Sequence, residues 1–103
     1  NGKEEGLETW WRENGEKSSE THYKNGKEEG LETQWDERGM KESEVHYKNG
    51  EKEGLATWWY ESGGRYREAN YKNGKENGIR KEWDEDGELT FLGNFIDGVL
   101  DIK

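Results

Sequence analysis

The chain contains no cysteine and no proline, and apolar residues never form a long run. The absence of cysteine excludes disulfides and thiolate metal sites. The absence of proline means that no backbone donor is lost from a β-ladder. No stretch approaches the roughly 20 apolar residues that a membrane-spanning helix requires, and no signal peptide is visible.

Aliphatic residues are also scarce, because hydrophobic residues make up only 26% of the chain and charged residues 40%. That balance is typical of disordered chains. The aromatic content of 13% indicates the opposite, because disordered chains contain few large apolar rings. We therefore predict an ordered, heavily solvated chain without a deep core. Repeat proteins do not need one, since each unit packs only on its neighbours.

The formal net charge is −9. This charge disfavours nucleic acid, whose binding depends on Lys and Arg that neutralise phosphates. It disfavours anionic membrane surfaces for the same reason. We therefore expect no nucleic acid and no membrane, and a partner, if there is one, that is a basic protein or peptide.

One phrase organises the chain, from Tyr23 to Trp35, and it returns at residues 47–59 and 71–83 with a constant step of 24 residues. A fixed period of this length marks a repeat architecture. We expect a single repeat array over residues 1–103. Its predicted units are residues 1–22, 23–46, 47–70 and 71–94, with 95–103 as a C-terminal cap or partial unit.

The most apolar stretch follows Leu89 and includes Phe91, Leu92, Phe95 and Ile96. Atypical terminal units usually cap an array. This tail either covers the final edge strand or continues into further sequence, and we favour the cap. Because the chain starts inside a repeat and without Met, we expect it to be part of a longer protein.

Each unit predicts two strands and two turns. Residues 31–36 and 41–47 alternate apolar or β-branched with polar residues, the period-2 signal of a half-buried strand. Arg38-Gly39 and Asn49-Gly50 separate such runs, and Asn and Gly tolerate positive φ. No apolar pattern has the period of a helix. The predicted fold is all-β, an elongated, twisted, single-layer antiparallel meander of β-hairpin repeats with about eight strands.

The hairpin register depends on the length of the loop after Trp35. A two-residue loop would place Tyr47 on the face opposite Trp35. A three-residue loop with Gly in the αL conformation would pair Trp35 with Lys41 and Leu31 with Val45, so that Trp, Leu and Tyr share one face. We favour the second register, because a buried face fixes the pairing. Small side chains would then leave room for the Trp rings: Ser19, Thr21, Ser43, Val45 and Ala69.

Aromatic residues recur at two identical positions of the units. We interpret them as the thin core, a ladder of rings that stack along the array and cover glycines. A single-layer sheet cannot bury both of its faces, so the ladder can also take part in binding. The ladder comprises Trp11, Trp35, Trp59, Trp83, Tyr23, Tyr47, Tyr71 and Phe95.

Trp10 and Trp58 break the repeat, because the other two units hold Gln and Glu at the same position. We predict that both lie on the more polar face, near Tyr60 and Tyr66. Trp and Tyr are enriched in binding hot spots. These four residues are therefore the candidate protein-binding residues; the alternative is that they pack on Arg or Lys stems or on a flanking domain.

Other candidate sites are weaker. His22 and His46 would lie two strands apart, about 9.6 Å, which is too far for a compact metal shell, so we interpret them as solvated surface residues. Residues 84–88 lack the bidentate Glu of a calcium loop and read as a hairpin turn. The sequence has no nucleophile–base constellation and no phosphate loop. We predict no catalytic, cofactor or metal site.

The pattern Tyr-x-Asn-Gly-x-x-x-Gly-Leu, followed by an aromatic residue and a Gly-containing turn, resembles the MORN-repeat variant of bacterial proteins. MORN abbreviates membrane occupation and recognition nexus. The resemblance covers essentially the whole chain and implies an elongated, twisted sheet of hairpins. Members are often described as antitoxins. The eukaryotic branch is associated with membranes and cytoskeletal partners, and this chain departs from it in being acidic.

Four hypotheses follow for the function. The first is a structural and protein-interaction module, with neutralisation of a basic toxin as its most specific form. The second is a spacer of the cell surface or envelope. The others are an engineered chain, which the divergence of the units disfavours, and a lipid-binding surface. We also expect bare edge strands that invite pairing between chains.

Overall fold

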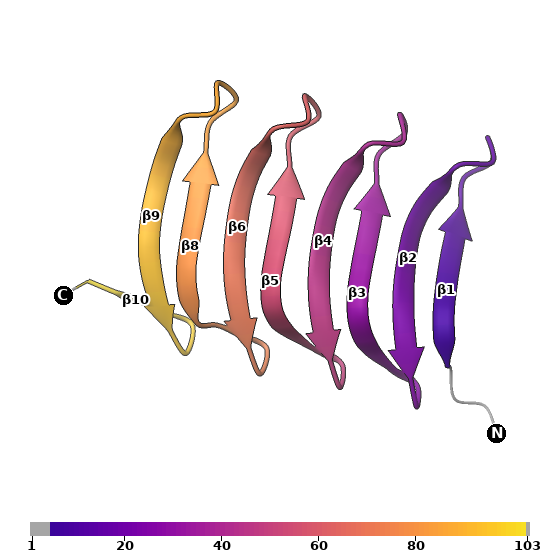
Figure 1. Cartoon of the computed structure of the whole chain (residues 1–103), viewed down its shortest axis with the longest axis horizontal. Coiled ribbons are helices and arrows are strands. Elements are labelled where there is room, and N and C mark those ends of the chain that lie inside the picture. The colour runs from indigo at the N-terminus through magenta and orange to yellow at the C-terminus, as the bar shows by residue number, and fades with distance from the viewer. Residues whose placement is uncertain (1–4, 103) are drawn as a thin grey trace.

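The computed structural model describes residues 5–102, which form one open sheet of antiparallel strands (Figure 1). The predicted all-β meander of hairpins is confirmed. Sequential strands are neighbours along the path β1-β2-β3-β4-β5-β6-β8-β9-β10, and β7 pairs with β6. The strands are β1 (Gly6–Trp11), β2 (Lys17–Lys24), β3 (Lys27–Trp35), β4 (Lys41–Lys48), β5 (Glu51–Trp59), β6 (Arg65–Lys72), β7 (Lys75–Glu76), β8 (Gly78–Trp83), β9 (Leu89–Ile96) and β10 (Val99–Asp101).

The described chain has ten strands where the sequence predicts about eight. One addition arises because the strand that is continuous in β3 and β5 is interrupted at Asn77, which separates β7 from β8. The other is β10, the apolar tail, whose three residues pair with Asn94–Ile96 at one end of β9. The tail therefore covers part of the edge of β9.

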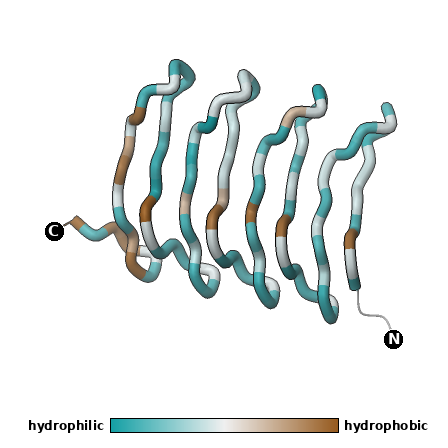
Figure 2. The backbone as a smooth tube through the Cα atoms, in the orientation of Figure 1, coloured by the Kyte–Doolittle hydropathy of each residue, from teal (hydrophilic) through white to brown (hydrophobic). Residues whose placement is uncertain are grey.

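The sheet is a single layer, with extents of 50 × 32 × 12 Å. Its accessible surface is 7036 Å², whereas a compact monomer of the same mass would expose about 6,000 Å². Figure 2 shows apolar residues as short, separate segments of a chain whose other residues are mostly hydrophilic. Among the described residues no large side chain is fully buried, and the buried residues are Thr21, Thr33, Asp36, Ser43, Val45, Ala56, Thr57, Ala69 and Phe95.

The loop after each Trp of the ladder has the predicted three-residue form. In the second unit Asp36 N donates to Met40 O at 2.7 Å, and Gly39, with φ +84°, donates from N to Asp36 O at 3.0 Å. The Asp36 carboxylate accepts hydrogen bonds from the backbone N–H groups of Arg38 and Met40. The predicted Trp35–Lys41 pair is confirmed. Residues 84–88 form the same turn, as predicted.

The rest of the predicted register is wrong, because a β-bulge follows the loop. Glu42 has no partner in β3, so Ser43 pairs with Gln34, and Leu31 pairs with His46 instead of Val45. One extra residue moves every later side chain of the strand to the other face. Trp35 and Tyr47 therefore lie on opposite faces, and the expectation that Trp, Leu and Tyr share one face is incorrect.

The bulges recur in each unit and divide the ladder between two faces. We call them the Trp face and the Tyr face. The Trp face carries Trp11, Trp35, Trp59 and Trp83 together with Leu7, Leu31, Leu55 and Ile79. The Tyr face carries Tyr23, Tyr47, Tyr71 and Phe95. The small residues Ser19, Thr21, Ser43, Val45 and Ala69 lie on the Tyr face, so they do not make room for the ladder Trp rings.

The Asn-Gly turns attach each unit to the one before it. Asn49 and Gly50 both have positive φ, 52° and 83°, as a two-residue type I′ turn requires. Gly50 N donates to Glu28 O at 2.9 Å, and Asn49 N donates to the Glu29 carboxylate at 3.0 Å. The same pair of bonds joins Asn73-Gly74 to the unit that precedes it. In each case the acceptor is the Glu that lies four residues after the Asn of the preceding turn. These bonds therefore explain why the Asn-Gly turn and this Glu recur together.

Histidine has a structural role in the middle of the strands. The register of the β4–β5 pairing shifts between Val45 and Tyr47. At this shift His46 Nδ1 lies 2.8 Å from Leu55 O. His22 makes the same contact with Leu31 O at 3.0 Å. Asn70 replaces His in the third unit, and its Nδ2 donates to Ile79 O at 3.0 Å. Both histidines are exposed as predicted, but each one also binds the backbone of the neighbouring strand.

Because Asn70 makes the same contact as His46, we predict that His46→Asn keeps the free energy of unfolding close to that of the wild type. His46→Ala removes the side-chain donor to Leu55 O and should lower that free energy by about 1 kcal/mol, the net value of one such bond. Urea unfolding of the three proteins measures the difference. Equal losses in His46→Asn and His46→Ala would show that packing, not the hydrogen bond, makes the contribution.

Candidate functional site

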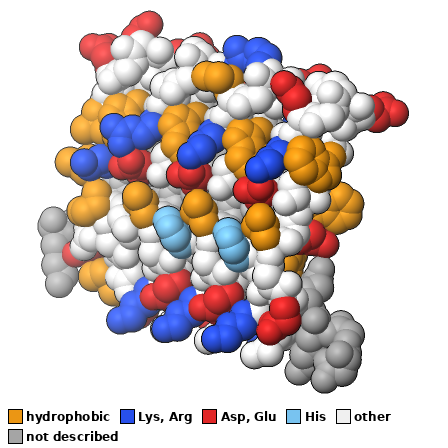
Figure 3. Space-filling view, turned by 45° about the vertical axis from the view of Figure 1, so that its right-hand side comes forward, with side chains coloured by type: hydrophobic (Ala, Val, Ile, Leu, Met, Phe, Trp, Pro, Cys, Tyr) orange, Lys and Arg blue, Asp and Glu red, His pale blue; other side chains and the backbone are white. Residues whose placement is uncertain are grey.

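On the Trp face, aromatic and cationic side chains alternate across neighbouring strands. Figure 3 shows this alternation as a row of orange and blue side chains. Lys17 Nζ lies 6.0 Å from the ring centroid of Trp11 and 5.8 Å from that of Trp35, and Arg65 Cζ lies 4.7 Å from that of Trp83. These distances are those of cation–π contacts. We call this set the cation–aromatic row: Trp11, Lys17, Trp35, Lys41, Trp59, Arg65 and Trp83.

Each cation of the row is held by a carboxylate three residues further along its strand. The ion pairs Lys17–Glu20, Lys41–Glu44 and Arg65–Glu68 all have a separation of 2.5 Å. Because the cations are about half exposed, each pair contributes only about 0–1 kcal/mol. For the site, the ion pairs have two other effects: they hold the cations beside the Trp rings, and they offset the positive charge of the cations.

Three hollows lie between the cation–aromatic row and the loops. Each is lined by one Trp of the row, by the cation of the preceding strand and by a loop glycine, and their volumes are about 360, 260 and 430 Å³. They follow one another at the 24-residue step. In chain order the shared lining residues are Lys17, Trp35 and Gly39, then Lys41, Trp59 and Gly63, then Arg65, Trp83 and Gly87.

The loops beside these hollows carry most of the charge of the molecule. The four loops, residues 12–16, 36–40, 60–64 and 84–88, hold nine acidic and two basic side chains, which is seven of the nine net negative charges of the chain. All four loops lie at the same end of the strands, and we call them the acidic edge. At the opposite edge of the sheet, lysines flank the Asn-Gly turns: Lys24, Lys27, Lys48, Lys72 and Lys75.

The four predicted binding residues do not form one patch. Trp10 and Trp58 lie on the Tyr face, four strands apart, a separation of about 19 Å. Trp10 is 60% exposed, and Arg67 Cζ lies 5.1 Å from the Trp58 ring centroid. Tyr60 and Tyr66 lie together, with centroids 5.1 Å apart. A binding role for these residues stays a prediction.

Tyr60 has a structural role that the sequence does not reveal. Its hydroxyl donates to Trp83 O at 2.8 Å, which links the third loop to the next unit. Arg12, the equivalent residue of the first unit, donates from Nη2 to Trp35 O at 2.9 Å. Arg38 likewise donates to Glu61 O. The loops of the acidic edge are therefore joined to one another in sequence.

The three ladder tyrosines of the Tyr face are partly buried. Burial raises the pKa of Tyr47 to about 12, and the nearby Glu32 and Glu28 carboxylates add to the effect. Burial also raises the pKa of Tyr71, whose ring centroid lies 4.9 Å from Lys52 Nζ. Tyr47 and Tyr71 therefore keep their protons at neutral pH and serve as neutral packing residues.

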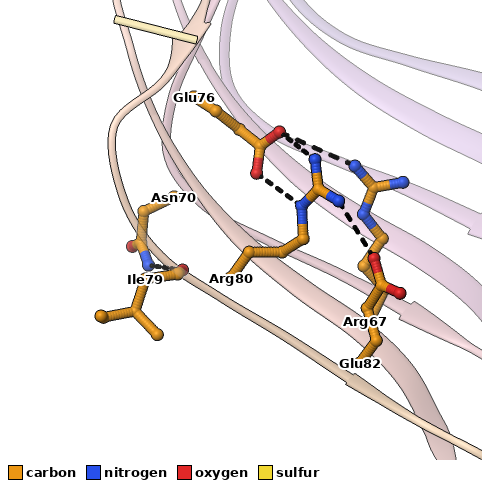
Figure 4. Close-up of polar contacts among 6 residues, drawn as sticks. All are labelled: Arg67, Asn70, Glu76, Ile79, Arg80 and Glu82. Carbon is orange, nitrogen blue, oxygen red and sulfur yellow. Dashed lines mark hydrogen bonds and ion pairs between the residues drawn. The ribbon is translucent and has the colours of Figure 1, made fainter. Parts of the chain in front are cut away.

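A charged cluster on the Tyr face is absent from the sequence-based predictions (Figure 4). Arg80 donates from Nε and Nη2 to the two oxygens of Glu76 at 2.9 and 2.7 Å, and from Nη1 to Glu82 at 3.2 Å. Its guanidinium carbon lies 4.4 Å from the Phe95 ring centroid. The available signal was that Arg80 replaces Glu32 and Ala56 of earlier units. Because its groups bind one another, we interpret the cluster as stabilising.

Within residues 5–102 no three His, Asp or Glu side chains are close enough together to hold a metal ion. The hydrogen bonds of Asp36 and Asp84 go to their own loops. The hydrogen bonds from Met40 N and from Arg38 outweigh the effect of burial and lower the pKa of Asp36. No helix that is long and apolar enough to cross a membrane occurs among the described residues.

Comparison with known proteins identifies the repeat. A family model described as "MORN repeat variant" matches four segments, residues 4–25, 28–49, 52–73 and 76–97. Successive matches start 24 residues apart, and together they span most of the chain. A search among curated proteins gives no match.

The Glu76–Arg80 pair predicts a specific pH dependence. The hydrogen bond from Arg80 lowers the pKa of Glu76 below its ordinary value. The pair therefore contributes its full stability above the unfolded-state pKa, about 4.3, and loses it as pH falls through the folded-state pKa. Glu76→Gln should lower the free energy of unfolding by about 1–2 kcal/mol at pH 7, and the gap should close towards pH 3.

Urea unfolding at several pH values measures this gap. The control is Glu51→Gln, at an exposed residue of the opposite edge, which should follow the wild type at every pH. A gap that stays constant from pH 7 to pH 3 would contradict the linkage.

Proposed function

The chain belongs to the MORN repeat variant family, and we propose that it is a non-catalytic structural and protein-interaction module that binds a basic protein through its acidic edge. The concentration of charge carries this proposal. Seven of nine net negative charges lie on four loops at one edge of the sheet. Such a one-sided charge attracts a basic partner from a distance and orients it before contact.

The Trp face supplies the contact surface next to that charge. Four Trp residues are in one row, and binding hot spots are enriched in Trp, Tyr and Arg. The sheet measures 50 by 32 Å, so one face offers about 1,600 Å², twice the roughly 800 Å² that a typical stable interface takes from one partner. The face is therefore large enough for a stable interface without any rearrangement of the sheet.

Neutralisation of a basic toxin is the most specific form of this function. The family resemblance and the acidic edge support it, because an acidic surface can cover the basic surface of a toxin. In this form the chain acts by steric and electrostatic blockage and needs no catalytic group. The spacer hypothesis requires no surface of this kind, and the same experiment separates the two.

The test measures which protein of the native source the chain retains, and on which edge. Glu61→Lys combined with Glu85→Lys reverses two charges of the acidic edge, and we expect it to release a partner that the wild type retains. The matched control combines Glu8→Lys with Glu51→Lys, which changes the net charge equally but away from that edge. Retention should also weaken strongly between 50 and 500 mM salt, since exposed charges are screened.

The outcomes separate the alternatives. Equal retention by the edge variant and the control would place the partner elsewhere on the sheet. Retention of no discrete protein would overturn the interaction and favour the spacer. A retained partner that is itself acidic would overturn the electrostatic argument.

A further inference from the structure

We propose that the cation–aromatic row and its three hollows bind a proline-rich segment of the partner, held as a polyproline II helix with a basic residue at every third position. This inference rests on the proposed function and names the chemistry of the partner. The matching period of the hollows and of such a helix carries it, together with the charge beside them.

The period of the hollows is set by the sheet. They recur on every second strand, and two strands span about 9.6 Å. A polyproline II helix has three residues per turn and a rise of about 3.1 Å, so the same side chain position returns every 9.3 Å or so. Over the two steps that separate three hollows, the mismatch is only about 0.6 Å.

Other backbone conformations fit this spacing less well. Two turns of an α-helix advance about 10.8 Å, which gives a mismatch of about 2.4 Å over the same two steps. In an extended strand, residues three apart point to opposite faces and cannot enter successive hollows. The sheet itself stays within 12 Å in its third dimension, so bending of the row out of the plane of the sheet is limited.

The lining of the hollows suits proline rings. Each hollow offers the side of an indole, and the loop glycine beside it adds no side chain to the space. Aromatic-lined grooves are the usual receptors of proline-rich segments, because the ligand is already ordered before it binds. Lys41 and Arg65 lie between successive hollows, and Lys17 borders the first. The ion pairs of these cations with Glu20, Glu44 and Glu68 offset the charge that would repel a basic ligand.

Acidic side chains of the loops line the two outer hollows, where basic residues of the ligand would lie. Glu16 lines the first hollow, and Asp84, Glu85 and Asp86 line the third. In the second hollow Met40 takes the place of Glu16. These carboxylates supply the negative charge that basic side chains of the ligand would meet beside the two outer hollows. A neutral ligand, such as a β-1,4-linked glucan, would leave this charge unused.

The probe is a synthetic peptide of four Arg-Pro-Pro triplets, and the control peptide has the same composition with irregularly spaced arginines. Binding to the whole chain is followed by Trp fluorescence and calorimetry. We expect the regular peptide to bind about tenfold more tightly, because only its residues enter all three hollows in register. Trp59→Leu should weaken it about thirtyfold, the loss expected when one hot-spot residue is truncated.

The Tyr face supplies the matched variant. Phe91→Leu removes an aromatic ring from that face and should leave the affinity unchanged, and circular dichroism checks that both variants keep the sheet. Equal affinities of the two peptides would overturn the spacing argument while leaving the binding of basic proteins intact. Equal losses of affinity in both variants would overturn the placement of the peptide on the Trp face. Equally tight binding of a β-1,4-linked glucan hexasaccharide would overturn the class of ligand.

Discussion

The hydrogen bonds between successive units are the constraint on which this structure depends. A single layer of strands has no second sheet or helix to bury its faces, so each unit is stable only through its neighbours. Gly50 N donates to Glu28 O, and Asn49 N donates to the Glu29 carboxylate, so every Asn-Gly turn is fixed to the unit before it. The loops at the other end of the strands are joined in the same way, since the Tyr60 hydroxyl donates a hydrogen bond to Trp83 O of the next unit.

The same constraint explains how a chain with little apolar surface can be ordered. Long side chains with charged ends supply packing surface through their apolar stems. On the Trp face Lys17 lies between the rings of Trp11 and Trp35, and on the Tyr face Arg80 lies over Phe95. Cations thus take the place that aliphatic residues occupy in a two-layer protein. Both faces of the sheet therefore stay open to solvent.

Sequence patterns predicted the local structure well where backbone geometry is decided by a few residues. Asn49-Gly50 and Gly39 adopt the positive φ values that their turns require, and the loop pairs Trp35 with Lys41 as expected. The prediction failed one residue further on. The bulge at Glu42 has no sequence signature of its own, because Ser, Tyr and Thr occupy the same position in other units. A single unpaired residue then moved Tyr47 to the other face.

The sequence by itself determined the period, the turn types and the all-β meander, because these depend on residues that are close in the chain. The tertiary structure decided which side chains share a face, that His46 binds a strand carbonyl, and that Arg80 joins Glu76 and Glu82. These features depend on how neighbouring strands align. Alignment is a cooperative property of the sheet, because the bulge after each loop shifts the later pairs of that hairpin. It also aligned the four Trp residues in one row, whereas the sequence of each unit shows only that a Trp precedes its loop.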